Sequence, residues 1–179
     1  MSNHTQKITL AGGCFWCIES AFNNVQGITS AVSGYMGGQT NNPSYQDITT
    51  GKTGHAEVVQ LTFDDTVITT KEIFEIFFSL HNPTQLNYQG HDVGTQYRSA
   101  IFFHHPRQQT EALKIITQIN QDEIWPDPVV TSVELQTKFY TGENYHQEYF
   151  NKNPGNPYCQ VIISPKLAKF KQTFASKLK

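Results

Sequence analysis

Apolar residues recur along the chain with two spacings, one typical of strands and the other of helices. Apolar and polar side chains alternate over residues 28–34, as in a half-buried strand, whereas Ile18, Ala21 and Phe22 recur at helical spacing. The same reasoning predicts further strands at residues 7–11, 55–63, 97–103 and 129–135, helices at 15–24, 69–80, 106–121 and 143–151 and from Pro165 onward, and a strand or packed arm at 160–163.

The order of these elements predicts the fold. The first six run β-α-β-β-α-β, which is the arrangement of a two-layer ferredoxin-like sandwich of the α/β (α+β) class, followed here by a C-terminal extension. Because no linker or repeat interrupts the pattern, we expect one catalytic domain over residues 1–179. Strand ends gather the loops in such a fold, and functional residues are expected there.

Composition limits the possible partners. The formal net charge is only −2, so no global basic field is expected to attract nucleic acid or an acidic membrane surface. The polar start, residues 1–7, and the lack of a long apolar run indicate neither a signal peptide nor a membrane span. Three cysteines suit working thiols in a reducing compartment. We therefore expect a cytoplasmic protein. We also expect a monomer that uses neither a metal nor an organic cofactor.

The segment Gly12-Gly13-Cys14 carries the first chemical signal. Two glycines permit a sharp turn between a strand and a helix, and a cysteine at the start of a helix faces its positive dipole end. That environment favours thiolate, so we interpret Cys14 as a nucleophile. A buried structural cysteine, or half of a zinc site with Cys17, are the alternatives, although only Cys159 remains and no histidine pair stands at ligand spacing.

Glu57 gives the second signal through its position in a strand. It shares one face with Val59 and Leu61, so its carboxyl group is predicted to project from the apolar face near a long polar loop, residues 35–54. Desolvation would raise its pKa and let it act as a general acid near neutral pH. The alternative is an edge glutamate whose side chain curls into water.

Seven segments together resemble the methionine sulfoxide reductase A family, the peptide-methionine (S)-S-oxide reductases. They cover most of the chain in the family's order, and they are Gly13-Cys14-Phe15-Trp16, Gly34-Tyr35-Met36-Gly37-Gly38, Asn42-Pro43-Ser44-Tyr45, Thr53-Gly54-His55-Ala56-Glu57-Val58-Val59, His81-Asn82-Pro83-Thr84, Asp92-Val93-Gly94-Thr95-Gln96-Tyr97-Arg98-Ser99 and Asn144-Tyr145-His146-Gln147. Enzymes of this class reverse the oxidation of methionine.

The resemblance implies a role for each matched residue. The nucleophile falls on Cys14 and the acid on Glu57, and the substrate is methionine-(S)-sulfoxide, peptide-bound or free. The other implied positions are the hydroxyls that bind the sulfoxide oxygen, Tyr45 and Tyr97, a supporting carboxylate, Asp92, and the aromatic pocket floor, Phe15 and Trp16. Without the family match, the tyrosines could simply be packing residues and Asp92 a turn residue.

The reaction leaves a sulfenic acid that a second thiol must resolve. The resemblance implies Cys159, which follows His146-Gln147, Asn153-Pro154 and Tyr158 in the family's recycling pattern, with thioredoxin as the final reductant. The family's glycine-rich tail is replaced here by residues 160–163, and position 17, commonly glycine, is Cys17. We favour Cys159 because it follows a loop rich in proline and glycine, and Cys17 stays the alternative because it lies one helical turn from Cys14.

Two other functions fit parts of the sequence. A thioredoxin-like dithiol oxidoreductase would use Cys14 and Cys17 to reduce disulfides directly. A non-catalytic peptide-binding module would use the aromatic residues alone, and it would tolerate Cys14→Ser without loss of activity.

Overall fold

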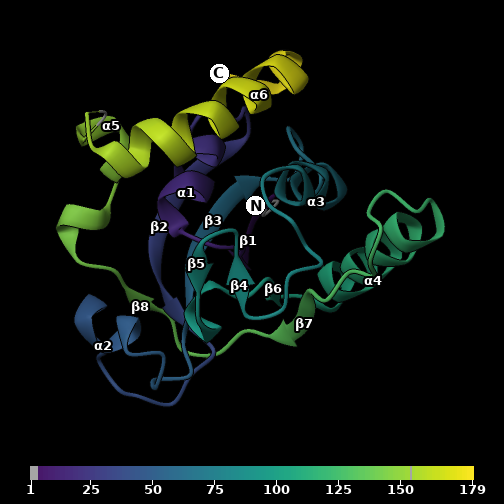
Figure 1. Ribbon diagram of the computed structural model, residues 1–179. Coiled ribbons are helices and arrows are strands. Elements are labelled where there is room, and N and C mark those ends of the chain that lie inside the picture. The colour runs from purple at the N-terminus through teal and green to yellow at the C-terminus, as the bar shows by residue number, and fades with distance from the viewer. Residues whose placement is uncertain (1–3, 154) are drawn as a thin grey trace.

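The computed structural model describes residues 4–153 and 155–179. Within them, the predicted β-α-β-β-α-β core is present (Figure 1). Its elements are β1 (Thr5–Ala11), α1 (Phe15–Asn23), β2 (Ile28–Met36), β3 (Ala56–Asp64), α3 (Thr70–Ser79) and β6 (Ala100–Phe103).

Additional elements surround this core in the described residues. Those before residue 125 are α2 (Tyr45–Thr49), β4 (Tyr88–Gln89), β5 (Asp92–Val93), the 3₁₀ helix η1 (Thr95–Tyr97) and α4 (Pro106–Gln121). Those after it are β7 (Ser132–Leu135), β8 (Tyr140–Thr141), η2 (Asn144–His146), α5 (Tyr149–Lys152), the π-helical η3 (Cys159–Ile163), α6 (Ser164–Thr173) and η4 (Ala175–Lys177).

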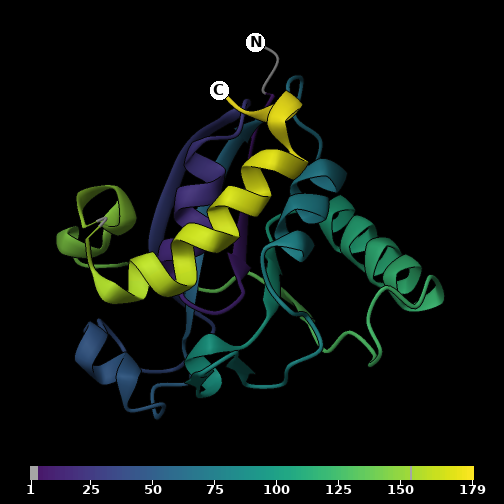
Figure 2. The same cartoon turned by 45° about the horizontal axis from the view of Figure 1, so that its top comes forward.

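The central sheet has the strand order β7-β6-β1-β3-β2-β8. Its four inner strands are antiparallel to their neighbours, which is the ferredoxin-like order, while β7 adds to β6 in parallel and β8 adds to β2. Helices α1 and α3 cover one face, and α6 packs across α1 (Figure 2). The predicted fold is therefore confirmed. The C-terminal extension adds one strand to each edge of the sheet, β7 beside β6 and β8 beside β2.

The predicted apolar stripes form the core. Ile18, Ala21 and Phe22 of α1 are buried against the sheet, and a capping box of Thr69 and Glu72 begins the predicted second helix, α3. The opposite face has a smaller apolar cluster, in which Phe139 packs against Met36, Val58 and Phe102 among others. No helix in the described part of the chain has both the length and the apolar character needed to cross a bilayer.

Three predicted elements differ from the structure. Residues 160–163, predicted as a strand or packed arm, belong to the π-helical η3 and lead directly into α6. The helix predicted over 143–151 is broken at Glu148, whose φ of 54° lies in the left-handed region. The strand predicted from residue 97 begins at Ala100, because residues 95–97 form η1. Residues 1–3 and Pro154 of the Asn153-Pro154 pair lie outside the described residues.

The register of the sheet determines which loops meet. Leu10 pairs with Val59, Ala11 with Ala100, and Tyr35 with Glu57. Because these strands are antiparallel, the C-terminal ends of β1 and β2 and the N-terminal ends of β3 and β6 lie together at one end of the strands. The other end of α1 lies beside the C-terminus, where Lys179 donates its backbone N–H to Asn24.

We predict that Gly38→Ala destabilises the fold by about 1–3 kcal/mol, the usual cost of overpacking. A Cβ at position 38 would lie 2.2 Å from the backbone nitrogen of His55 and 2.5 Å from the carbonyl oxygen of Thr53. Gly155→Ala is the control, since no atom lies within 4 Å of the added Cβ. Urea unfolding of both variants measures the difference in stability. Equal stability would contradict the close approach of Gly38 to Thr53 and His55.

Candidate active site

Cys14 follows β1 at the end of the sheet where the ends of β1 and β2 lie beside the starts of β3 and β6. Gly13 has a φ of 84°, and its N–H donates to the carbonyl oxygen of Tyr97 over 3.2 Å. A Cβ on Gly13 would approach the Gln89 side chain to 2.8 Å. Only glycine therefore fits this turn, and the turn holds Cys14 against the segment that carries Asp92 and Tyr97.

The protonation state of Cys14 differs from the sequence-based prediction. Cys14 is the N-cap residue of α1, as expected, and the Trp16 N–H favours its thiolate. Burial and, after it, the charge of Glu57 nevertheless raise the Cys14 pKa well above its usual value. Desolvation thus outweighs the effect of the helix start, so the structure raises the Cys14 pKa rather than lowering it, and the role of Cys14 as nucleophile stays a prediction.

Glu57 is 1% exposed and lies among the apolar residues of β3, as its position in the strand predicted. Its Oε1 accepts the backbone N–H of Phe15 at 3.3 Å, and its Oε2 has no partner among the described residues. Burial, with a further contribution from Asp92, raises its pKa to about 8, although the Phe15 N–H opposes the shift. Glu57 therefore holds a proton at neutral pH, and the alternative of an edge glutamate in water is wrong.

Tyr45 and Tyr97 reach the same site from two separate segments. Tyr45 opens α2, which is capped by Ser44 and Asp47, and Tyr97 ends η1. Burial first, and then the charge of Glu57, raise the pKa of both phenols. Both hydroxyls are therefore protonated and able to donate hydrogen bonds, and both lie near enough to Glu57 and Cys14 for those charges to raise their pKa values.

Phe15 and Trp16 differ in their exposure. Phe15 is completely buried and lies beneath the site, whereas Trp16 is half-buried. The Trp16 indole stacks on Tyr149, with ring centroids 3.8 Å apart and an interplanar angle of 9°. The position of the Trp16 indole therefore depends on Tyr149, a residue of the C-terminal extension.

Sequence reasoning gave no role to several residues of that extension. The Tyr158 hydroxyl donates to Asp92 over 2.6 Å, and its ring meets Trp16 edge-on at 5.9 Å. Burial and the adjacent Cys14 raise its pKa. Glu143 accepts the Tyr45 backbone N–H at 3.0 Å. Their places beside matched family segments were the only available signal, because contacts between residues 66 to 142 positions apart in the sequence leave no periodic pattern.

The two possible resolving cysteines are both buried free thiols. Cys17 lies in α1, close enough for its charge to affect the Cys14 pKa, and its own pKa is raised to about 11 by burial. Cys159 is completely buried and begins η3. The Cys159 thiol therefore belongs to a packed helical segment that follows the predicted loop at 153–157, and the choice between Cys159 and Cys17 stays a prediction.

No group of three or more histidine, cysteine, aspartate or glutamate side chains within the described residues could hold a metal ion.

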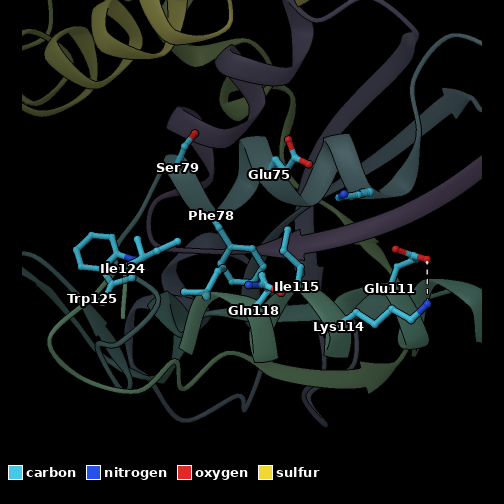
Figure 3. Close-up of a pocket in the computed structure, with 11 residues that line it drawn as sticks. Glu75, Phe78, Ser79, Glu111, Lys114, Ile115, Gln118, Ile124 and Trp125 are labelled. Atoms are coloured by element: carbon cyan, nitrogen blue, oxygen red, sulfur yellow. Dashed lines mark ion pairs between the residues drawn. The ribbon is translucent and has the colours of Figure 1, made fainter. Parts of the chain in front are cut away.

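A groove of about 730 Å³ lies elsewhere, between α3 and α4. It is lined by Phe78, Ile115, Ile124 and Trp125, with charged residues at its rim (Figure 3). None of the site residues lines it, so it is separate from the chemistry around Cys14.

Comparison with known proteins identifies the family. The sequence model of the family described as peptide methionine sulfoxide reductase matches residues 6–178. Two relatives are named peptide methionine sulfoxide reductase MsrA. The protein from Polynucleobacter asymbioticus is 48% identical over 96% of this chain and 90% of its own length. The protein from Leptospira borgpetersenii is 51% identical over 94% of each chain.

Solved structures of Mxr1 from Saccharomyces cerevisiae agree with this comparison. The reduced form is 36% identical and has a TM-score of 0.81 over 87% of this chain and 90% of its own. An unusual oxidized form, 35% identical, has a TM-score of 0.64 over 87% and 86%, and a complex with Trx2, 27% identical, has 0.57 over 82% and 85%. Sequence, fold and the site around Cys14 and Glu57 therefore agree: this chain is an oxidoreductase that belongs to the peptide methionine sulfoxide reductase family.

Proposed function

We propose that this protein reduces methionine-(S)-sulfoxide, in peptides and free, with Cys14 as nucleophile and Glu57 as general acid. One observation carries the proposal: a buried carboxyl group with a raised pKa and an unpartnered Oε2 lies close enough to the half-buried Cys14 thiol for its charge to raise the Cys14 pKa. A sulfoxide sulfur yields to a thiol only when its oxygen is protonated as it leaves. Glu57 is the donor that this reaction requires.

The first step transfers the oxygen atom from the substrate to Cys14. The thiol sulfur forms a bond to the sulfoxide sulfur while Glu57 protonates the sulfoxide oxygen. The resulting hydroxyl then transfers to the Cys14 sulfur as the substrate S–O bond and the new S–S bond both break, and the thiol proton restores Glu57. The products are the methionine thioether and a Cys14 sulfenic acid, so the balance is RSH + R′₂SO → RSOH + R′₂S. We assign Tyr45 and Tyr97 to hydrogen bonds with the developing oxyanion, Asp92 to support of the site, and Phe15 and Trp16 to the pocket for the ε-methyl group.

The decisive test is chiral analysis of a racemic methionine sulfoxide peptide after incubation with the enzyme and a dithiol. We expect only the S epimer to disappear, and Cys14→Ser to abolish its consumption while the fold is retained, because an alcohol is a far weaker nucleophile. Direct reduction of insulin disulfides without sulfoxide turnover would instead support a thioredoxin-like oxidoreductase. Unchanged ligand binding and no turnover in either protein would support a peptide-binding module.

We predict that Glu57→Gln slows single-turnover oxidation of Cys14 by roughly 10²–10⁴-fold, the range for loss of a general acid. The wild-type rate should fall as pH rises through about 8, because Glu57 loses its proton there. That decline should be absent in Glu57→Gln, whose amide does not titrate. Stopped-flow measurement from pH 6 to 10 checks both expectations, and an unchanged rate in the variant removes Glu57 from the mechanism.

We further propose that Cys17 is the first thiol to attack the sulfenic acid, which forms a disulfide and releases water. Cys17 lies one turn from Cys14 on α1, so closure requires little rearrangement. Cys159, favoured from the sequence, would need η3 to leave the core. The lower TM-score to oxidized than to reduced yeast Mxr1 supports that alternative, because the relative evidently changes conformation on oxidation.

Peptide mapping after one turnover without reductant distinguishes the two thiols. We predict that the first-formed disulfide joins Cys14 to Cys17, and that Cys159→Ser keeps cycling with thioredoxin while Cys17→Ser accumulates sulfenic acid. A Cys14–Cys159 disulfide, with a stalled Cys159→Ser enzyme, would restore the sequence-based preference.

Thioredoxin as the reductant is supported by the yeast Mxr1 structure in complex with Trx2. Three free thiols suit a reducing compartment, so we propose a cytoplasmic enzyme that repairs oxidised proteins. We also propose that residues 1–179 act as one catalytic domain and as a monomer, since the site residues all come from one chain. Sedimentation of the reduced protein would test the monomer directly.

A further inference from the structure

Glu143 brings three tyrosines together beside the proposed active site. It directly precedes η2, and its side chain is half-buried. Its Oε1 accepts the Tyr35 hydroxyl at 2.9 Å, and its Oε2 accepts the Tyr45 backbone N–H at 3.0 Å. The Tyr145 hydroxyl also donates to Oε2, over 3.3 Å. One carboxylate therefore joins the C-terminal extension to both β2 and α2.

These hydrogen bonds keep Glu143 in its charged form. Burial acts to raise its pKa, but the bonds from the Tyr45 N–H and the Tyr35 hydroxyl hold the pKa below its usual value. Among the described residues, no lysine or arginine forms an ion pair with this carboxylate. The partners of Glu143 are thus hydrogen-bond donors that belong to the site or lie next to it.

Tyr35 is the fixed end of this arrangement. Its side chain is completely buried, and its backbone pairs with that of Glu57 across β2 and β3. Gly142, which precedes Glu143, donates its N–H to the Ser33 carbonyl oxygen of β2 over 2.8 Å. Glu143 therefore has a defined position relative to the strands that carry the proposed acid.

Tyr45 is the end that needs support. It opens α2, a helix of five residues that Figure 1 shows apart from α1, α3 and α6. Within the described part of the chain, its bond to Glu143 is the one hydrogen bond that joins residues 45–49 to any segment beyond residues 44–51. The buried Ile48 side chain attaches α2 by apolar contact, which is less directional than a hydrogen bond.

The position of Tyr45 matters for the proposed chemistry. Burial, and then the charges of Glu57 and Cys14, raise the pKa of its hydroxyl, so the hydroxyl lies near both reacting groups. A donor stabilises developing charge only when it points to the place that the charged oxygen will occupy. Small displacements of a positioned group are costly for the same reason. The support of α2 therefore decides how much the Tyr45 hydroxyl contributes to the reaction.

We propose that Glu143 is a positioning residue for oxygen transfer, which sets the Tyr45 hydroxyl relative to Glu57 through its bonds to the Tyr45 N–H and the Tyr35 hydroxyl. Its effect falls on the transition state more than on substrate binding, because the charge on the substrate oxygen increases as the sulfur is attacked. This inference rests on the proposed role of Tyr45. It adds a residue that lies outside the segments that carry the family resemblance.

The matched variants are Glu143→Gln and Glu143→Leu. The Gln amide oxygen can still accept the Tyr45 N–H while its NH₂ group donates to the Tyr35 hydroxyl oxygen, whereas leucine offers neither contact. Both variants remove the negative charge, so a difference between them reports the hydrogen bonds alone. Tyr97→Phe is the background for both, because it leaves Tyr45 as the one phenol assigned to the substrate oxygen.

In that background we expect Glu143→Leu to lower the maximal single-turnover rate of Cys14 oxidation about 10-fold, and to change the half-saturating sulfoxide concentration less than about twofold. Glu143→Gln should stay within about threefold of the background rate. Equal rate defects in the two variants, or a defect in the half-saturating concentration alone, would overturn the proposal. If Glu143→Leu does not fold, Glu143→Ala takes its place with the same expectation, because alanine also lacks an acceptor.

A double-mutant cycle tests whether Glu143 acts through Tyr45. When Tyr45→Phe is added to Tyr97→Phe, neither assigned hydroxyl remains, so Glu143→Leu should change the rate less than about twofold. An undiminished 10-fold effect would show that Glu143 acts by another route and would overturn the proposal. If Tyr45→Phe itself leaves the rate of Tyr97→Phe unchanged, the role of Tyr45 is refuted and this inference with it. Consumption of the S epimer by the wild type would still support the proposed function, so the two failures are distinguishable.

Discussion

The burial of a carboxyl group beside a thiol is the constraint on which this structure depends. Burial raises the pKa of both Glu57 and Cys14, and the charge of Glu57 further disfavours the Cys14 thiolate. Both therefore hold their protons at rest. The bond from the Phe15 N–H to Glu57 Oε1 ties the acid to the first residue after the nucleophile. Substrate oxygen would supply the partner that Glu57 Oε2 lacks.

This arrangement separates the enzyme from proteins that rely on a thiolate. A low thiol pKa exposes a cysteine to oxidation by many agents, because the thiolate is the reactive form. Here the thiol proton and the acid proton stay in the site until a sulfoxide enters. In the proposed mechanism, selectivity comes from the donors assigned to its oxygen, Glu57, Tyr45 and Tyr97, rather than from general reactivity of Cys14.

The C-terminal extension completes the site from outside the sandwich. Glu143 holds the start of α2 through Tyr45, His146 bonds to Trp16, and Tyr158 bonds to Asp92. The thiol of Cys159 directly follows the last of these contacts. The residue that precedes Cys159 is therefore bonded to the site in this structure, whereas the Cys159 thiol itself is buried.

Local patterns in the sequence determined the elements and much of the site. Two glycines before Cys14 required a turn, helical spacing placed Ile18 and Phe22 in the core, and the position of Glu57 in β3 buried its carboxyl group. Each result depends on contacts between near neighbours, whose geometry follows from residue type. The roles of Tyr45, Tyr97 and Asp92 came from family resemblance, since no local pattern distinguishes them.

Only the tertiary structure decided the protonation of Cys14, the helical form of residues 159–163 and the position of His146. A pKa depends on the total of burial and neighbouring charge, and the Glu57 carboxyl group that raises the Cys14 pKa lies 43 residues away in sequence. The Trp16–His146 bond spans 130 residues. Sequence spacing carries no information about such distant contacts, because the register of the sheet and the packing of the C-terminal extension bring them together.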